Sequence, residues 1–245
     1  MRRQNVWLKV LAISNVILFI LLTILSLHYK VPQKILNKLG FIKMESPILG
    51  YTYLNYRQMA IHSLVNGNGG FEIVMLGDSI TEGANWNELL NRADVANFGI
   101  GGDTTTYLIH RLFDIYLAKP KKCFLMIGIN DFVSNDTVEN VFKNYKRIIE
   151  EIKDHNIEVA IQSTLCISEK ALKFNFINNI ETINSKVKDL NGLLKEYCLE
   201  NKITYLDINA VMSKNEILDG QNTHDGVHLN KNGYEKWKKI LMEYI

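Results

Sequence analysis

The chain has 245 residues, of which 47% are hydrophobic and 22% charged, and its formal net charge is +2. This balance is typical of a globular protein and excludes an intrinsically disordered chain. So weak a positive charge, without an RNA- or DNA-binding motif, argues against nucleic acid as a partner. The cysteines Cys123, Cys166 and Cys198 lie far apart in apolar stretches. We therefore expect buried free thiols, and neither a disulfide framework nor a metal site.

The first 30 residues have the pattern of a membrane anchor. Residues 1–9 contain three basic side chains, and the 18 residues over 10–27 contain no charge. As a helix, that run spans about 27 Å, just enough for the hydrocarbon core of a bilayer. A cleaved signal peptide is the alternative, but the apolar run is long for a signal core and bulky residues follow it. We predict a single-pass anchor in residues 1–30 with the rest of the chain outside the cytoplasm, although lysines on the far flank weaken that orientation.

Residues 31–66 are expected to form a stalk followed by a helix. Two of the three prolines of the chain fall between residues 28 and 66. Apolar residues then recur at helical spacing from Tyr53 to Leu64, so this helix could cover one edge of a sheet. Asn66-Gly67-Asn68-Gly69-Gly70 interrupts the chain before the next apolar run. We place the main domain at residues 67–245.

Within the main domain, short apolar runs alternate with amphipathic stretches. Strands are expected at 71–76, 95–98, 123–127, 157–161 and 203–206, and helices over 107–116, 138–152, 177–197 and 234–244. Strands separated by helices imply right-handed crossovers and a parallel sheet. The sequence predicts a three-layer α/β/α domain with about five parallel strands.

Four polar clusters fall at the strand ends of this pattern. They are Gly77-Asp78-Ser79, Asn97 to Asp103, Gly128 to Asp131, and Asp225 to His228. The carboxyl ends of parallel strands meet at one edge of a sheet, where open α/β sheets place their chemistry. We therefore expect the four clusters to lie close together.

Together these clusters contain the groups that acyl transfer requires. A serine hydroxyl is a poor nucleophile until a base takes its proton, and His228 is the candidate base for Ser79. Asp225, three residues before His228, can fix the imidazole tautomer. The backbone N–H groups of Ser79 and Gly102 and the side-chain amide of Asn130 could stabilise the oxyanion. Taken alone, Ser79 after a strand would more often be a simple helix cap.

The four clusters resemble the motif blocks of the SGNH hydrolases, the GDSL esterase/lipase family. The match is Ser79 in GDSIT, Gly102 in NFGIGGDTT, Asn130 in GIND, and Asp225 with His228 in DGVHL, all in family order. The resemblance covers about residues 70–245. It implies a flavodoxin-like fold and a serine esterase with no metal and no organic cofactor. The first block reads GDSI instead of GDSL, a change of one apolar residue.

Other interpretations of the same residues have less support. The α/β-hydrolase motif G-x-S-x-G is incomplete because Thr81 replaces its second glycine. A dinucleotide-binding glycine motif after residue 98 lacks its third glycine. His224 and His228 have a spacing that suits a metal on a helix, but Gly226 lies between them. Asp78, Asp103 and Asp131 each adjoin a proposed catalytic residue, and we expect them to support the site by bonding loop N–H groups.

The expected activity is hydrolysis of a carboxylic ester through an acyl-enzyme. An enzyme outside the membrane could deacetylate surface or environmental polysaccharide, so a small-molecule or glycan acetyl ester is the preferred substrate. A lysophospholipase or lipase, and an acyltransferase to a sugar hydroxyl, are the alternatives. Residues 132–135 and 167–176 are expected to shape the acyl pocket. The sequence does not indicate an oligomeric state.

Overall fold

The computed structural model of the chain describes residues 57–65, 70–175, 177 and 179–245. Thr52–Ile245 make up one compact unit. The anchor helix predicted over residues 10–27 lies outside the described residues, and so does most of the predicted stalk. In the part of the chain that the structure describes, no helix combines the length and the apolar character needed to span a bilayer.

A parallel sheet of five strands forms the centre of the domain, as predicted. The strands are β1 (Ile73–Gly77), β2 (Val95–Gly99), β3 (Lys122–Met126), β4 (Glu158–Gln162) and β5 (Thr204–Leu206). Their order is β2-β1-β3-β4-β5, with every neighbouring pair parallel. This is the strand order of flavodoxin-like doubly wound sheets. Because both faces are covered, the central strands are apolar throughout, and Val74, Met75 and Leu76 are fully buried.

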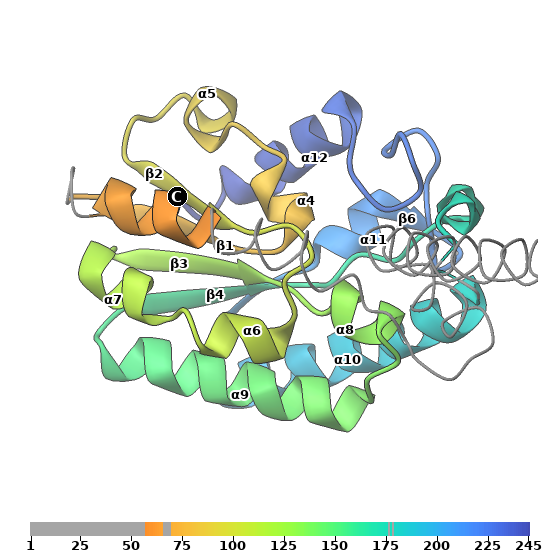
Figure 1. The fold of residues 1–245 in the computed structure, drawn as a ribbon, viewed down its shortest axis with the longest axis horizontal. Coiled ribbons are helices and arrows are strands. Elements are labelled where there is room, and N and C mark those ends of the chain that lie inside the picture. Colours follow the sequence, from red (N-terminus) through yellow and green to blue (C-terminus); the bar gives the residue numbers. More distant parts are fainter. Residues whose placement is uncertain (1–56, 66–69, 176, 178) are drawn as a thin grey trace, which may run out of the picture. The chain divides into compact units, whose positions relative to one another are not determined.

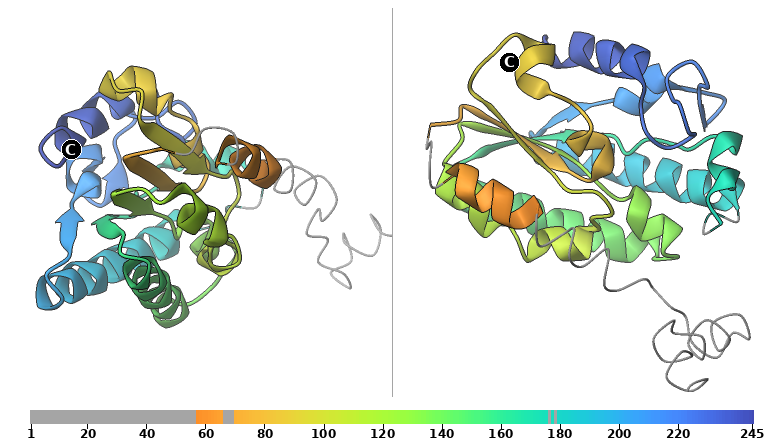
Figure 2. Two further views of the ribbon diagram at one scale, coloured as in Figure 1. Left: turned by 90° about the vertical axis from the view of Figure 1, so that its left-hand side faces the viewer. Right: turned by 45° about the horizontal axis from the view of Figure 1, so that its top comes forward.

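Helices cover both faces of the sheet (Figure 1 and Figure 2). One face carries α5 (Trp86–Leu90), α11 (Ile208–Met212) and α12 (Lys231–Leu241); the other carries α6 (Thr105–Ile109), α7 (Phe113–Ala118), α9 (Val138–Asp154) and α10 (Ile180–Glu200). Shorter elements lie at the carboxyl edge of the strands or beyond β5: α4 (Ser79–Glu82), α8 (Ile129–Val133), the 3-10 helix η1 (Glu169–Lys173), and the hairpin of β6 (Ser213–Lys214) and β7 (Ile217–Leu218). The three cysteines are buried and free, as expected.

The structure corrects the continuous helix expected over residues 107–116. The chain forms α6 and α7 instead and breaks between them, at residues 110–112. The break turns Arg111 inward, where only 5% of the residue is exposed. There its guanidinium donates hydrogen bonds to the carbonyl oxygens of Gly77 and Phe98. The apolar periodicity identifies the buried residues Leu108, Leu112 and Ile115, but Tyr107 is 54% exposed. The periodicity also cannot indicate that an arginine at position 111 has hydrogen-bond acceptors in the sheet.

The order of the strands determines where the chemistry lies. The chain goes from β1 to β2 in one direction, and then back past β1 to β3, so the direction of winding reverses beside β1. Gly77 at the end of β1 is in register with Gly99 of β2 and Met126 of β3. The segments that follow these three residues therefore leave the sheet side by side, at the switch point where open α/β sheets bind ligands.

Candidate active site

Ser79 is the first residue of α4, directly beyond β1. Asp78 caps this helix by accepting a hydrogen bond from the N–H of Ile80 at 2.9 Å. A side chain at Gly77 would collide with the carbonyl of Met126 and with Thr81, so the turn requires a glycine at this position. Ser79 is thus held at a tight turn with its hydroxyl at the carboxyl edge of the sheet, and it remains partly exposed.

Ser79, His228 and Asp225 form a continuous hydrogen-bonded chain. Ser79 Oγ lies 2.9 Å from His228 Nε2, and His228 Nδ1 lies 2.7 Å from Asp225 Oδ2. Because a carboxylate only accepts hydrogen bonds, Nδ1 carries the imidazole proton and Nε2 is left to accept from the serine hydroxyl. This is the arrangement that turns a serine into a nucleophile.

The carboxylate of Asp225 is held ionised by its own loop. Its Oδ1 accepts hydrogen bonds from the N–H groups of Val227 and His228, at 2.9 and 2.7 Å. Burial opposes ionisation, but the bonds from the imidazole and these two N–H groups outweigh it and lower the pKa of Asp225 to about 2. Asp225 is therefore an anion throughout the working pH range of an esterase, and it can stabilise an imidazolium on His228.

The 3-10 helix η1 and the residue before it pack against the loop that carries Asp225 and His228. The N–H of Ser168 donates to the carbonyl of Gly226 at 2.9 Å. Gly226 has a φ of +96°, and a side chain there would collide with the backbone of Ala171. Residues 167–176 were expected to shape an acyl pocket. In the structure Ile167 and Ala171 are buried beside the loop of Gly226, whereas about half of Leu172 is exposed, so the pocket role of this segment stays a prediction.

Gly102 and Asn130 lie on adjacent segments beyond β2 and β3. Asn130, on α8, donates from Nδ2 to the carbonyl of Asp103, at 2.9 Å. The backbone of Gly102 has a φ of +78°, and its Cα faces open space. The loop is a tight turn closed by the N–H of Asp103 bonding to the carbonyl of Ile100. One amide hydrogen of Asn130 therefore holds this loop, and the second is available to another acceptor.

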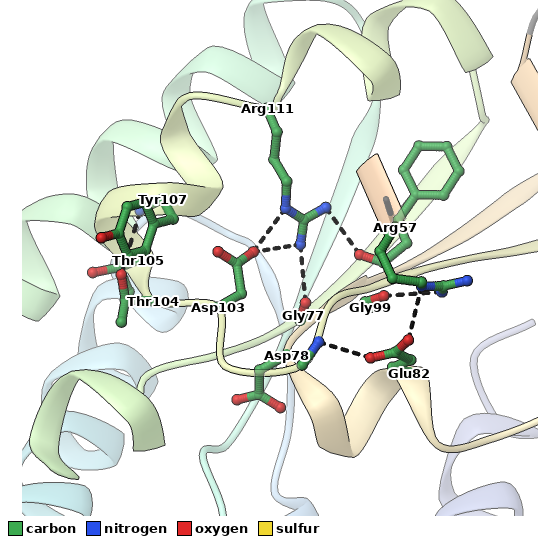
Figure 3. Close-up of polar contacts among 12 residues, drawn as sticks. Arg57, Gly77, Asp78, Glu82, Gly99, Asp103, Thr104, Thr105, Tyr107 and Arg111 are labelled. Carbon is green, nitrogen blue, oxygen red and sulfur yellow. Dashed lines mark hydrogen bonds and ion pairs between the residues drawn. The ribbon is translucent and has the colours of Figure 1, made fainter. Parts of the chain in front are cut away.

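Three buried carboxylates support these loops, and each uses different partners. Asp103 forms an ion pair with Arg111, the guanidinium lying 2.6 Å from Oδ2 (Figure 3). Asp131 accepts hydrogen bonds from the N–H and hydroxyl of Thr105. Asp78 caps α4. The expectation that all three bond loop N–H groups holds, since Asp103 also accepts a hydrogen bond from the N–H of Thr104. What was not expected is that Asp103 also binds an arginine from the segment predicted to be helical.

Residues 75–236 match the GDSL-like Lipase/Acylhydrolase family. The chain belongs to this family. The match includes Ser79, Gly102, Asn130, Asp225 and His228. The resemblance to SGNH/GDSL hydrolases found in the sequence is confirmed.

The sequence identity between the chain and individual relatives is low. The chain is 26% identical over 159 residues to an N-acylneuraminate cytidylyltransferase of Streptococcus agalactiae, covering 64% of this chain and 35% of that protein. The chain thus spans about a third of the length of that curated relative. It is 28% identical over 182 residues to the human platelet-activating factor acetylhydrolase IB subunit alpha2, covering 71% of this chain and 76% of that one. The solved structure of a GDSL-like lipase from Bacteroides thetaiotaomicron has the same fold, with a TM-score of 0.68 and 24% identity, covering 78% of this chain and 97% of that one.

Sequence analysis missed three charged residues around the GDSL site: Arg57, Glu82 and Arg111. Arg111 lies within the helix predicted over residues 107–116, and an arginine in such a helix is normally exposed to solvent. Glu82 lies three residues after Ser79, and its role depends on a loop from another strand. Arg57 precedes the residues that match the family. No local pattern marks any of them, because their partners are distant in sequence.

One cluster of the described residues has the composition of a metal site. His224, Asp225 and His228 have ligand atoms within 4.8 Å of one another. The chemistry of this set fits a metal poorly, because Asp225 Oδ2 already accepts from His228 and Oδ1 accepts two backbone N–H groups. An ion here would have to break the hydrogen bond that orients the histidine. We therefore derive no catalytic step from a metal.

Burial of Asp78 gives the stability of the protein a defined pH dependence. Burial, with repulsion from Asp103 and Asp131, raises the pKa of Asp78 to about 7. The folded state therefore keeps a proton that the unfolded chain releases near pH 4. The stabilisation is fully present below pH 4 and is lost as pH rises towards 7. One pKa unit corresponds to about 1.4 kcal/mol, so the loss is of the order of 1–4 kcal/mol.

Asp78→Asn is expected to remove this pH dependence. An asparagine stays neutral, and its amide oxygen can still cap Ile80. The free energy of unfolding of the variant, relative to that of the unmodified protein, should rise by about 1–4 kcal/mol between pH 4 and pH 8. Urea unfolding at both pH values measures this difference, and a constant offset cancels. A difference that does not change with pH would show that Asp78 is ionised in the folded protein.

Asn130→Ala is expected to lower kcat by about 10²–10³-fold, with little change in KM. Losing one preorganised donor to an oxyanion costs about 3–4 kcal/mol in the transition state. Kinetics on a p-nitrophenyl ester measure both constants. Asn144→Ala is a matched control, because Asn144 Nδ2 also bridges two elements, donating to Thr105 at 2.9 Å. A loss of kcat below about threefold would exclude Asn130 from oxyanion stabilisation.

Proposed function

We propose that Ser79, His228 and Asp225 are the catalytic residues of a serine esterase that removes acetyl or other short acyl groups from saccharides. The observation that carries the catalytic part is the chain of two hydrogen bonds from Asp225 through His228 to the hydroxyl of Ser79, 2.7 and 2.9 Å long. Ser79 also lies at the turn after β1, beside the switch point of the sheet.

In the proposed mechanism, Ser79 Oγ attacks the ester carbonyl carbon while its proton moves to His228 Nε2. The C–O bond to the alcohol breaks, and His228 returns the proton to the leaving oxygen. A water molecule then gives a proton to His228 Nε2 and attacks the acyl carbon. The bond between this carbon and Ser79 Oγ breaks, and His228 returns the proton to Oγ, which releases the acid and restores Ser79. Asp225 stays ionised and stabilises the imidazolium in both half-reactions.

The oxyanion formed in each half-reaction needs donors that are in place beforehand. The N–H groups of Ser79 and Gly102 and the free amide hydrogen of Asn130 are the proposed donors. Two features support this assignment. Asn130 is bonded to the carbonyl of Asp103, the residue next to Gly102, and the Gly102 Cα faces open space where a substrate could approach.

The name of one relative supports short acyl groups, and the name of another supports a saccharide. One is named as an acetylhydrolase, and the other as an enzyme that acts on N-acylneuraminate, a sugar acid. A lipid ester is the second candidate, since the acetylhydrolase is named for platelet-activating factor. The same residues would also serve an acyltransferase that replaces water by a sugar hydroxyl.

A panel of esters separates these candidates. We expect kcat/KM to be at least tenfold higher for p-nitrophenyl acetate than for the octanoate, and acetate to be released from a peracetylated oligosaccharide. Ser79→Ala is the blank for each substrate. Preference for the octanoate, or for lysophosphatidylcholine, would contradict the saccharide proposal. An acylated product formed from an added glycan would identify a transferase.

We also propose that residues 1–30 anchor the enzyme in the cell membrane with its catalytic domain outside the cytoplasm. The uncharged run over residues 10–27 and the basic residues before it motivate this location. Protease added to intact cells should digest the domain. Protection of the domain until the cells are lysed would contradict this orientation.

A further inference from the structure

Arg57 reaches the site from a helix outside the family-matched residues. It is the first described residue of the helix that includes residues 57–65. Its Nη2 donates to the carbonyl of Gly99 at 3.0 Å, and its Nε lies 2.8 Å from Glu82 Oε1 (Figure 3). About three quarters of the Arg57 side chain and four fifths of the Glu82 side chain are buried, so this pair is shielded from solvent better than a surface ion pair.

Glu82 connects the helix of the nucleophile with the loop that carries Gly102. It is the last residue of α4, three residues after Ser79. Its second oxygen, Oε2, accepts a hydrogen bond from the N–H of Gly101 at 2.7 Å. Close packing reinforces the link, since a side chain at Gly99 would collide with the backbone of Glu82. The position of Gly101, and of Gly102 after it, is therefore set relative to Ser79 by one carboxylate.

The Gly102 loop, defined as residues 99–103, is thus held by an arginine at each end. At its start, Arg57 binds the carbonyl of Gly99 and the carboxylate that holds Gly101. At its end, Arg111 binds the carboxylate of Asp103. Between them, Gly102 has a left-handed backbone, and no atom packs where a side chain at this position would lie. Packing against Gly102 itself therefore does not restrict the orientation of its N–H group. The alignment of its N–H therefore depends on these attachments, together with the turn bond from Asp103 to Ile100 and the bond from Asn130 to the Asp103 carbonyl.

We propose that Arg57 and Glu82 are a positioning pair that holds the Gly102 N–H in line for the oxyanion. This inference rests on the proposed role of Gly102 as an oxyanion donor. Arg57 acts in two ways. It fixes the Glu82 carboxylate in the rotamer that binds Gly101. It also neutralises the negative charge of this carboxylate, which binds the residue next to the proposed oxyanion donor Gly102. An N–H group aligned before the reaction costs no reorganisation during it.

Arg57→Ala in the full chain is expected to lower kcat by about 10–100-fold, less than the loss of a whole donor. KM should stay within threefold, because the ground-state carbonyl depends little on this N–H. The pH at which kcat/KM is half-maximal should not move, because His228 and Asp225 keep their bonds. Arg57→Lys should recover part of kcat, since an ammonium can reach one of the two partners but cannot bind both in the forked geometry of a guanidinium.

Arg92→Ala is the matched control. Arg92 forms a 2.6 Å ion pair with Asp94, and about a third of each side chain is exposed. The pair lies just before the first residue of β2, whereas Gly99 is the last residue of that strand. Its loss removes an equivalent pair away from the Gly102 loop, so kcat should change less than twofold. Glu82→Gln combined with Arg57→Ala should cost less than the sum of the two single losses, because both residues act on the hydrogen bond between Glu82 and Gly101. The bond from Arg57 to the Gly99 carbonyl is lost only with Arg57.

Rates are expressed per active site, counted by titration with a fluorophosphonate. A fall in the number of active sites with an unchanged kcat per site would give Arg57 a purely structural role and overturn the inference. If Arg57→Ala does not fold, Arg57→Lys and Glu82→Gln provide the same comparison, and full kcat in both would overturn it. Failure of the fluorophosphonate to label Ser79 in the unmodified protein would instead overturn the proposed function.

Discussion

Ser79→Ala is expected to lower kcat for p-nitrophenyl acetate by about 10⁴–10⁶-fold and to leave the fold intact. Without the hydroxyl, His228 Nε2 loses the nucleophile that lies 2.9 Å away and whose proton it would accept. The oxyanion donors remain, so hydrolysis above the uncatalysed rate should persist at a low level. The partly exposed side chain contributes little to packing, so the thermal unfolding midpoint should move by only a few degrees.

The control for this variant is Ser185→Ala. Ser185 is exposed on α10, away from the catalytic loops, and its replacement should leave kcat within twofold. Activity of Ser79→Ala above about a tenth of the original would contradict the assignment of Ser79 as nucleophile. In that case the nucleophile would be a water molecule activated by His228.

Asp225→Asn is expected to lower kcat by up to about 10⁴-fold through the tautomer of His228. The asparagine oxygen can keep the bonds that Asp225 Oδ1 accepts from the N–H groups of Val227 and His228. The amide nitrogen then faces His228 Nδ1 and donates to it. The imidazole proton must move to Nε2, which points at Ser79 and can no longer accept the serine proton.

The loop itself provides a control for Asp225→Asn. Asp219 also accepts a backbone hydrogen bond, from Gln221 at 3.0 Å, and it pairs with Lys214. Asp219→Asn should therefore leave kcat within about threefold. An unchanged kcat in Asp225→Asn, with the fold verified by circular dichroism, would mean that the backbone alone fixes the histidine tautomer.

The parts of the fold that could be predicted are those with a local signal. Each strand of the sheet is a short run of apolar β-formers, and each was placed within a few residues of its position. The first three motif blocks could be assigned to one edge because they follow β1, β2 and β3, and parallel strands end together. The fourth block was expected at a strand end as well, but α11 and the hairpin of β6 and β7 separate it from β5. The hydrogen bond between Asp225 and His228 follows from their spacing of three residues on a single loop.

The parts that could not be predicted depend on contacts between distant segments. The break between α6 and α7 exists because Arg111 has acceptors at Gly77 and Phe98, residues of two different strands. The link from Arg57 through Glu82 to Gly101 joins three segments that periodicity treats separately. Residues 167–176 contain apolar side chains that suit a pocket or a packing role equally well. The hydrogen bond from Ser168 to Gly226 shows a packing role for the start of this segment, and a pocket role for its other side chains stays a prediction.

Covalent labelling is the most direct test of the central claim, that Ser79 is a nucleophile activated by His228 and Asp225. The full chain is treated with a fluorophosphonate, digested, and analysed by mass spectrometry. The account predicts one adduct, on the peptide that contains Ser79, and labelling that is strongly slowed in Asp225→Asn. No adduct, or an adduct on another serine with Ser79 unmodified, would contradict it.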